Sequence, residues 1–329
     1  MAFLLLIVSL GIILVAAEIF TNGVEWLGVR LHLSEGAVGS VLAAVGTAMP
    51  ESLIPLIAFL SGKGIEQQHV GIGAIIGAPF MLSTLAFFIS GLVVVLESKK
   101  RLDFPYLIVD EGVIRRDISF FFIGYALGLG AAFIPNPIIK YLIAAFLIIW
   151  YCCYVWLTLR SGKSAGHSSE LRSLYFSASK RAPRLLLIIF QVGCAISLLI
   201  FGANLFVKEV SVIAGLLGIP AFFLSLIVAP IATELPEKFN SVIWLLQKKD
   251  TLALGNITGA MVFQSVMLPS IGIIFTDWHF VSGSLAPVVL TFLSAGLVYL
   301  SLCLKRKLNA YVLMTGGLFY LIFLWVMLH

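Results

Sequence analysis

The chain has 329 residues, of which 60% are hydrophobic and only 11% are charged. Charged residues make up roughly a quarter of a soluble domain, and the mean hydropathy of this chain is +1.09. The composition therefore excludes a soluble domain and predicts an integral membrane protein, whose main partner is the lipid bilayer.

Ten apolar stretches follow one another along the chain. Each is long enough to cross a hydrocarbon core about 30 Å thick as a helix of about 20 residues. Their apolar positions are continuous and do not alternate, which favours helices over the strands of a membrane barrel. We expect an all-α integral membrane protein with ten transmembrane helices, the first of them retained rather than cleaved as a signal peptide. The stretches cover residues 2–28, 36–61, 68–96, 118–134, 137–159, 184–214, 219–247, 251–276, 282–304 and 308–328.

The polar joints between these stretches hold most of the basic residues. All but four of the 21 Lys and Arg lie in the joints 30–35, 97–117, 160–184, 248–250 and 305–307. Basic joints face the cytoplasm, so we expect these joints there, both termini outside, and the protein in the plasma (inner) membrane. The net charge of +5 then fits anionic lipid, and no nucleic-acid partner is expected.

Two linked motifs occur twice. Residues 45–51 (Val-Gly-Thr-Ala-Met-Pro-Glu) correspond to residues 231–237 (Ile-Ala-Thr-Glu-Leu-Pro-Glu), and the Gly-rich residues 73–78 correspond to residues 255–260. The paired glycines of the second motif also suit close helix packing, which small residues allow in any membrane bundle. The repetition predicts two related halves.

The halves are expected at residues 1–159 and 184–329, joined by the short basic loop 160–183. Five spans in each half mean that the second half enters the membrane from the opposite side. This is an inverted-topology repeat, which many secondary transporters use for alternating access.

Glu51 and Glu237 end the two copies of the first motif. An acid deep in a span costs roughly 2.5 to 3.5 kcal/mol on insertion scales and usually marks a pathway. Each follows a Pro, which frees backbone carbonyls to face a cavity. Carboxylate and carbonyl oxygens together suit a hard cation, although a single buried acid could instead be protonated or paired with a base.

The motifs ending at Glu51 and Glu237, each followed by a Gly-rich segment, resemble the two alpha repeats of the cation/calcium exchanger superfamily, which includes sodium/calcium exchangers. The resemblance extends over both halves and implies ten helices with the two Glu residues on the bound cation. Thr47 and Thr233 match the Thr positions of the superfamily, where their oxygens would complete the coordination shell.

The chain departs from this pattern mainly in its first half. Ala74, Ala78 and Leu82 stand where the superfamily has polar residues, whereas the second half keeps Asn256 and has Gln264 in place of the final Asn. Several expected oxygen ligands are therefore missing, and sodium sites are the ones most affected.

Three further charged residues are candidates for the pathway. Glu234 stands at the Ser position of the superfamily, and its i,i+4 spacing allows an ion pair with Lys238; alternatively, Glu234 is a third ligand. Glu18 aligns with Asn204 of the second half and either lines the path or holds a polar neighbour such as Asn22.

The sequence predicts no enzyme and no cofactor other than the transported cation. The expected function is secondary antiport, most simply export of Ca²⁺ or a similar divalent cation in exchange for H⁺ or Na⁺. A passive cation channel or uniporter and a transport-inactive scaffold with the exchanger fold are the alternatives. The transported ion, the coupling ion and the oligomeric state are left open.

Overall fold

The computed structural model describes residues 1–30, 43–61, 64–160, 173–177 and 183–328, apart from the side chains of residues 43–48, 61, 232, 235–237 and 328. This part of the chain forms eleven α-helices and one two-stranded sheet. The helices are α1 (Ala2–Arg30), α3 (Ala43–Ser61), α4 (Ile65–Met81), α5 (Phe87–Leu96), α6 (Glu111–Gly130), α7 (Pro137–Arg160), α8 (Leu185–Leu217), α9 (Ala221–Leu246), α10 (Asp250–Phe275), α11 (Leu285–Lys305) and α12 (Ala310–Leu328).

Length and hydropathy make the protein an all-α, multi-pass membrane protein. Among the described residues, eight helical segments are long and apolar enough to cross a membrane. One of them is the continuous helix Ile65–Leu96, in which a π-helical segment, Leu82–Ala86, joins α4 to α5. Helices α3 and α9, which carry the two Pro-Glu motifs, contribute only shorter apolar stretches, at Met49–Leu60 and Ala221–Ile231.

Helix α6 corrects one predicted boundary. It begins at Glu111, seven residues before the predicted span 118–134, because the Asp110 side chain caps its first turn by accepting from the backbone N–H groups of Gly112 and Val113 at 3.0 and 3.3 Å. The first two turns are polar, so hydropathy alone placed them in a joint.

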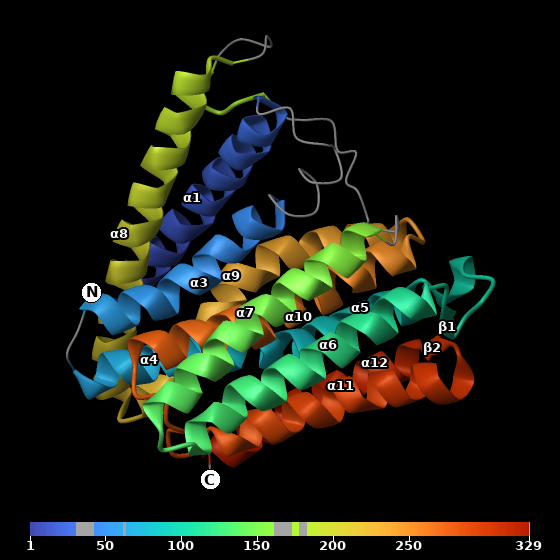
Figure 1. Ribbon diagram of the computed structural model, residues 1–329. Coiled ribbons are helices and arrows are strands. Elements are labelled where there is room, and N and C mark those ends of the chain that lie inside the picture. The colour runs from blue at the N-terminus through green and yellow to red at the C-terminus, as the bar shows by residue number, and fades with distance from the viewer. Residues whose placement is uncertain (31–42, 62–63, 161–172, 178–182, 329) are drawn as a thin grey trace.

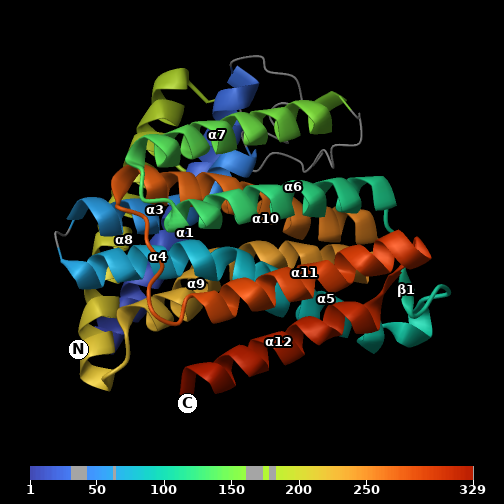
Figure 2. The same cartoon turned by 60° about the horizontal axis from the view of Figure 1, so that its bottom comes forward.

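The helices form two groups (Figures 1 and 2). Helices α1 and α8 are an antiparallel pair that rises steeply away from the other long helices, with α3 and α4 next to them. One hydrophobic cluster fills the space around α1, α3 and α8, and a larger one fills the bundle of the remaining helices. The candidate site lies where these two clusters meet.

Close packing between α4 and α9 depends on two glycines. A Cβ atom at Gly73 would clash with the carbonyl oxygen of Phe222, and one at Gly77 would clash with that of Leu226. The matching glycines of the second half differ. A Cβ atom added at Gly255 would meet no atom within 4 Å, and one added at Gly259 would lie 3.5 Å from the Tyr154 hydroxyl, an ordinary contact. The Gly-rich motif therefore acts as a packing motif in the first half alone.

Three of the basic joints meet at one end of the bundle. Strand β1 (Tyr106–Leu107) pairs with strand β2 (Leu308–Asn309), and Arg101 forms a buried ion pair with Asp250 at 2.8 Å. The two remaining basic joints are also adjacent, since Arg30 donates to the carbonyl oxygen of Pro183 at 3.0 Å.

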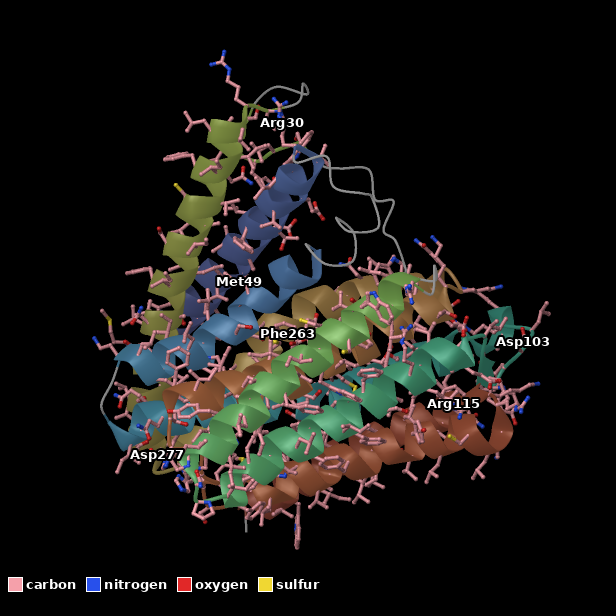
Figure 3. The ribbon with its side chains drawn as sticks, viewed as in Figure 1. Arg30, Met49, Asp103, Arg115, Phe263 and Asp277 are labelled. Atoms are coloured by element: carbon pink, nitrogen blue, oxygen red, sulfur yellow. The ribbon has the colours of Figure 1, made fainter. Side chains whose placement is uncertain are left out.

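The other joints gather at the opposite end. Lys140 donates to the carbonyl oxygen of Trp278 at 3.2 Å, and the rings of Phe133 and Phe280 lie 5.0 Å apart. Figure 3 shows Asp103 and Asp277 at these opposite ends of the bundle. Both chain ends lie on the Asp277 side in Figures 1 and 2.

Candidate cation site

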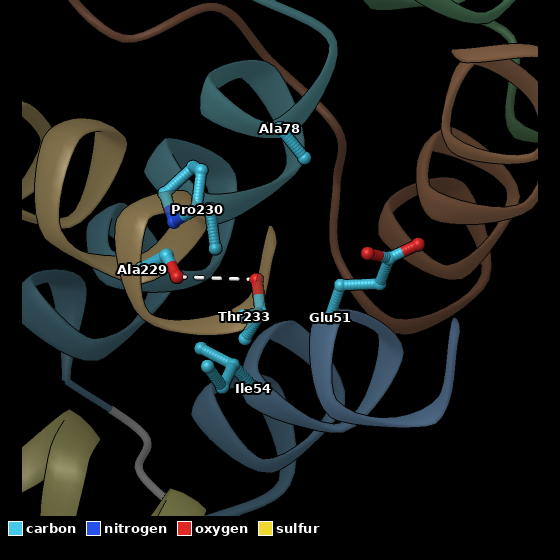
Figure 4. A pocket seen from close by; sticks show the side chains of 7 residues that line it. Glu51, Ile54, Ala78, Ala229, Pro230 and Thr233 are labelled. Atoms are coloured by element: carbon cyan, nitrogen blue, oxygen red, sulfur yellow. Dashed lines mark hydrogen bonds between the residues drawn. The ribbon is translucent and has the colours of Figure 1, made fainter. Parts of the chain in front are cut away.

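Glu51 of α3 is a buried acid, with 7% of its surface exposed. It lies directly after Pro50, inside a helix that contains a second proline at Pro55. Its side chain lines a narrow cleft together with Thr233 of α9 and Ala78 of α4 (Figure 4). The two predicted motif helices thus face each other across this cleft.

Gln264 of α10 connects the acids of the two halves. Its amide nitrogen donates to Oε2 of Glu51 at 3.2 Å and to Oε1 of Glu234 in a short hydrogen bond. Gln264 and Glu234 are fully buried. A single amide group therefore holds two carboxylates that are 183 residues apart in the sequence.

Glu234 also forms the ion pair that the i,i+4 spacing favours. The ammonium group of Lys238 lies 3.4 Å from Glu234 Oε2, and the two side chains are 5% and 0% exposed. Glu234 is thus held by Gln264 on one oxygen and by Lys238 on the other.

The remaining predicted ligands of the motif helices are positioned as follows. Thr233 is buried in the cleft wall, where its hydroxyl donates to the carbonyl oxygen of Ala229 at 3.2 Å (Figure 4). Thr47 lies on α3 and Glu237 on α9, and their side chains fall outside the described part of the chain. Glu237 follows Glu234 by three positions, which in a helix places the two on neighbouring positions of one face.

Two other candidates lie away from the cleft. The Asn256 amide donates to the Ser241 hydroxyl at 3.0 Å, about two helical turns, or roughly 12 Å, along α10 from Gln264. Glu18 is exposed on α1 and accepts a hydrogen bond from the Tyr175 hydroxyl at 2.8 Å. One polar neighbour of Glu18 is thus a residue of the central loop.

Helix α4 brings no oxygen ligand to the cleft. Ala74 and Ala78, which replace polar residues of the superfamily pattern, both form its wall, and Leu82 begins the π-helical segment beyond them. The oxygens that converge here come from α3, α9 and α10, so the site is asymmetric between the halves.

Another buried acid, Asp117 of α6, was not singled out by the sequence analysis because it falls in a stretch assigned to a polar joint. Its carboxylate accepts from Arg116 at 3.1 Å, from the Tyr154 hydroxyl at 3.1 Å and from the Thr258 hydroxyl at 2.8 Å. The network joins α6, α7 and α10. The sequence did offer a signal for this buried acid: Asp117 lies between Ile114 and Ile118, which are spaced as on one face of a helix.

The chemistry of the cleft suits a hard cation. The amide oxygen of Gln264 is buried and accepts no hydrogen bond from the described residues, next to the carboxylates of Glu51 and Glu234. Carboxylate, amide and hydroxyl oxygens are the ligands that Ca²⁺ takes in proteins. The described residues contain no group of three or more His, Cys, Asp and Glu side chains that could hold a metal.

The multi-pass helical fold and this cluster of buried oxygens are typical of membrane proteins that transport cations. The chain belongs to the sodium/calcium exchanger protein family, whose profile matches residues 1–160 and 187–329. The protein is accordingly a transporter and not an enzyme, and the superfamily identified from the two motifs is confirmed.

Three relatives illustrate the similarity. The inner membrane protein YrbG of Escherichia coli (strain K12) is 21% identical over 324 residues, which is 95% of this chain and 93% of YrbG. The crystal structure of the H⁺/Ca²⁺ exchanger CAX superposes with a TM-score of 0.74 at 18% identity, over 100% of this chain and 82% of that one. A structure of the sodium-calcium exchanger NCX_Mj gives a TM-score of 0.54 at 18% identity, over 98% of this chain and 96% of that one.

Proposed function

We propose that the protein is a secondary antiporter that exports Ca²⁺ or a similar divalent cation in exchange for H⁺ or Na⁺. The observation that carries this proposal is the buried cluster beside the cleft in which Gln264 donates to both Glu51 and Glu234, while its amide oxygen accepts no hydrogen bond from the described residues. A site with this polarity at the meeting of two helix groups is typical of a single occluded site reached from either side.

Glu51 and Glu237 are the proposed main cation ligands, with Thr47 and Thr233 completing the shell. In the structure, the Gln264 amide nitrogen points toward the carboxylates. A cation between them would repel that N–H group and attract the amide oxygen, so we expect the amide to rotate when a cation binds.

The proposed architecture is ten spans in two inverted halves, 1–159 and 184–329, around the cytoplasmic loop 160–183, with both termini outside. Its support is the position of the basic joints at the end of the bundle opposite the chain ends. In the proposed cycle the first two helices of each half, α1 with α3 and α8 with α9, move against the rest, and the steep α1–α8 pair is already set apart from the main bundle.

One observation favours a second candidate, a transport-inactive membrane scaffold. Ala74 and Ala78 leave the α4 wall of the cleft without oxygen ligands, and Lys238 already neutralises one acid. A passive channel gains no such support, because channels build ligand rings around an axis.

The test is uptake of ⁴⁵Ca²⁺, with Mg²⁺ and Mn²⁺ as competitors, into proteoliposomes that carry an outward gradient of H⁺ or Na⁺. Glu51→Gln and Glu237→Gln are each expected to reduce uptake at least about 100-fold, because each removes a charged ligand that the cation needs. The matched control is Glu97→Gln, which alters an acid paired with Lys100 at the basic end and should transport like wild type.

The outcomes separate the candidates. The gradient that drives uptake identifies the coupling ion of an antiporter. Uptake that persists without either counter-gradient indicates a uniporter or channel. The absence of uptake for every cation under every gradient would overturn transport in favour of the scaffold.

A further inference from the structure

Lys238 lies beside Glu234, next to the candidate cation site. Its side chain is 5% exposed and its ammonium group lies 3.4 Å from Glu234 Oε2. Both residues are on α9, one helical turn apart, and Glu234 stands next to Thr233 of the cleft wall. The ammonium group is therefore positioned as a monovalent counter-ion of an acid that reaches the site.

The pair is coupled to the central acid through Gln264. The Gln264 amide donates to both Glu234 and Glu51, so the sequence of contacts runs from Lys238 through Glu234 and Gln264 to Glu51. The charge at Lys238 thus acts on the same set of groups that would receive a transported cation.

The surroundings on the other side of Lys238 keep the ammonium group at Glu234. A second cavity of about 80 Å³ borders Lys238 between α5, α9 and α10. Among the described residues its wall is mainly aliphatic and aromatic, including Met81, Phe239 and Ile257, with the hydroxyls of Ser90 and Ser241 as the further polar groups. An ammonium ion in such a cavity would lack an opposite charge, which is strongly unfavourable inside a membrane.

We propose that Lys238 is a tethered cation that permanently occupies the Glu234 position, so that the site takes up one monovalent cation fewer than a site in which that acid is open. Lys238 is then a specificity-determining residue, since it sets how many ions accompany each transported divalent cation. This inference deepens the proposed function and uses the same site, but its test counts bound ions and does not require turnover.

The experiment is equilibrium binding of ²²Na⁺ and ⁴⁵Ca²⁺ to the full chain in lipid nanodiscs. Lys238→Met is expected to gain one Na⁺ per chain relative to wild type, because Glu234 is left as an open carboxylate at the same position. Lys238→Arg keeps the charge and is expected to bind the wild-type number of Na⁺ ions. An unchanged Na⁺ count in Lys238→Met would overturn the proposal.

A second variant covers the case in which Lys238→Met does not fold, because it leaves a buried acid unpaired. The double substitution Glu234→Gln/Lys238→Met leaves no charge at either position, and its net site charge equals that of wild type. If Lys238 is a tethered cation that already neutralises Glu234, this variant still binds Ca²⁺ and gains no Na⁺. If Glu234 is itself a Ca²⁺ ligand, the variant loses Ca²⁺ binding and the proposal fails.

The two proposals can fail separately. If wild type takes up no ⁴⁵Ca²⁺ but Lys238→Met binds one more Na⁺ than wild type, antiport is rejected and the tethered cation is kept. Normal uptake that depends on Glu51, together with an unchanged Na⁺ count in Lys238→Met, would keep antiport and reject the tethered cation.

Discussion

Two buried acids, Glu51 and Glu234, lie within one hydrogen-bonded cluster. Glu234 has Lys238, whereas Glu51 is held by the Gln264 amide. Replacing a buried ion pair with apolar residues is often neutral or stabilising, so stability alone gives little reason to keep this cluster. Its place between the motif helices supports the cation-binding role that we propose for it.

Asp117 belongs to a different class of buried acid. Every hydrogen bond that it accepts comes from a neighbouring helix or from the adjacent Arg116, and the network lies outside the residues that line the cleft. We interpret it as a structural junction of α6, α7 and α10.

This interpretation predicts different effects for two adjacent arginines. Arg116→Ala is expected to lower the free energy of unfolding by about 1–3 kcal/mol, because the buried Asp117 loses its charged hydrogen-bond partner. Arg115→Ala changes an exposed side chain and is expected to stay within about 0.5 kcal/mol of wild type. Melting temperatures measured by fluorescence-detected size exclusion in detergent compare the two, and equal shifts would contradict the junction.

At the level of helices, the α4–α9 contact sets the width of the cleft. Ala78 of α4 and Thr233 of α9 form part of its wall, and Gly73 and Gly77 let the two helix backbones approach closely. Any side chain at these glycines would push the walls apart.

We therefore predict that Gly77→Ala destabilises the protein by about 1–3 kcal/mol, as overpacking does in a filled core, and that it reduces ⁴⁵Ca²⁺ uptake. Its matched control is Gly255→Ala, at a position with open space, where Ala should be neutral or stabilise the helix by up to about 1 kcal/mol. Thermal melting and the uptake assay measure both variants. If Gly255→Ala were the more harmful of the two, the close contact would not lie where the structure has it.

At the level of the whole molecule, the joints are sorted between two ends of the bundle, and charge predicts which end faces the cytoplasm. Asp103 and Asp277 are exposed at opposite ends (Figure 3). Because three of the five basic joints meet at the Asp103 end, the positive-inside rule assigns that end to the cytoplasm.

This orientation can be measured by cysteine labelling in a background without the four native cysteines, Cys152, Cys153, Cys194 and Cys303. A membrane-impermeant maleimide is expected to label Asp277→Cys in intact cells and Asp103→Cys only after the membrane is opened. The reverse pattern would place the basic joints outside and invert the proposed topology.

Much of this architecture could be predicted from the sequence because hydropathy and helical spacing are local properties. The apolar stretches identified the helices, and the repeated Pro-Glu motif located Glu51 and Glu237. The i,i+4 spacing of Glu234 and Lys238 favoured the ion pair now present in the structure. The start of α6 was predicted wrongly because a capping Asp110 and two polar turns resemble a loop when only hydropathy is considered.

The sequence by itself determined the membrane class, the all-α fold, the family and the candidate acids, because each depends on residue type and on spacing within one helix. Only the tertiary structure decided that Gln264 joins Glu51 to Glu234, that Gly77 is tightly packed while Gly255 is not, and that Glu18 lies away from the cleft. These are contacts between residues far apart in the chain. Their geometry depends on how the helices cross one another, which no local pattern of residues specifies.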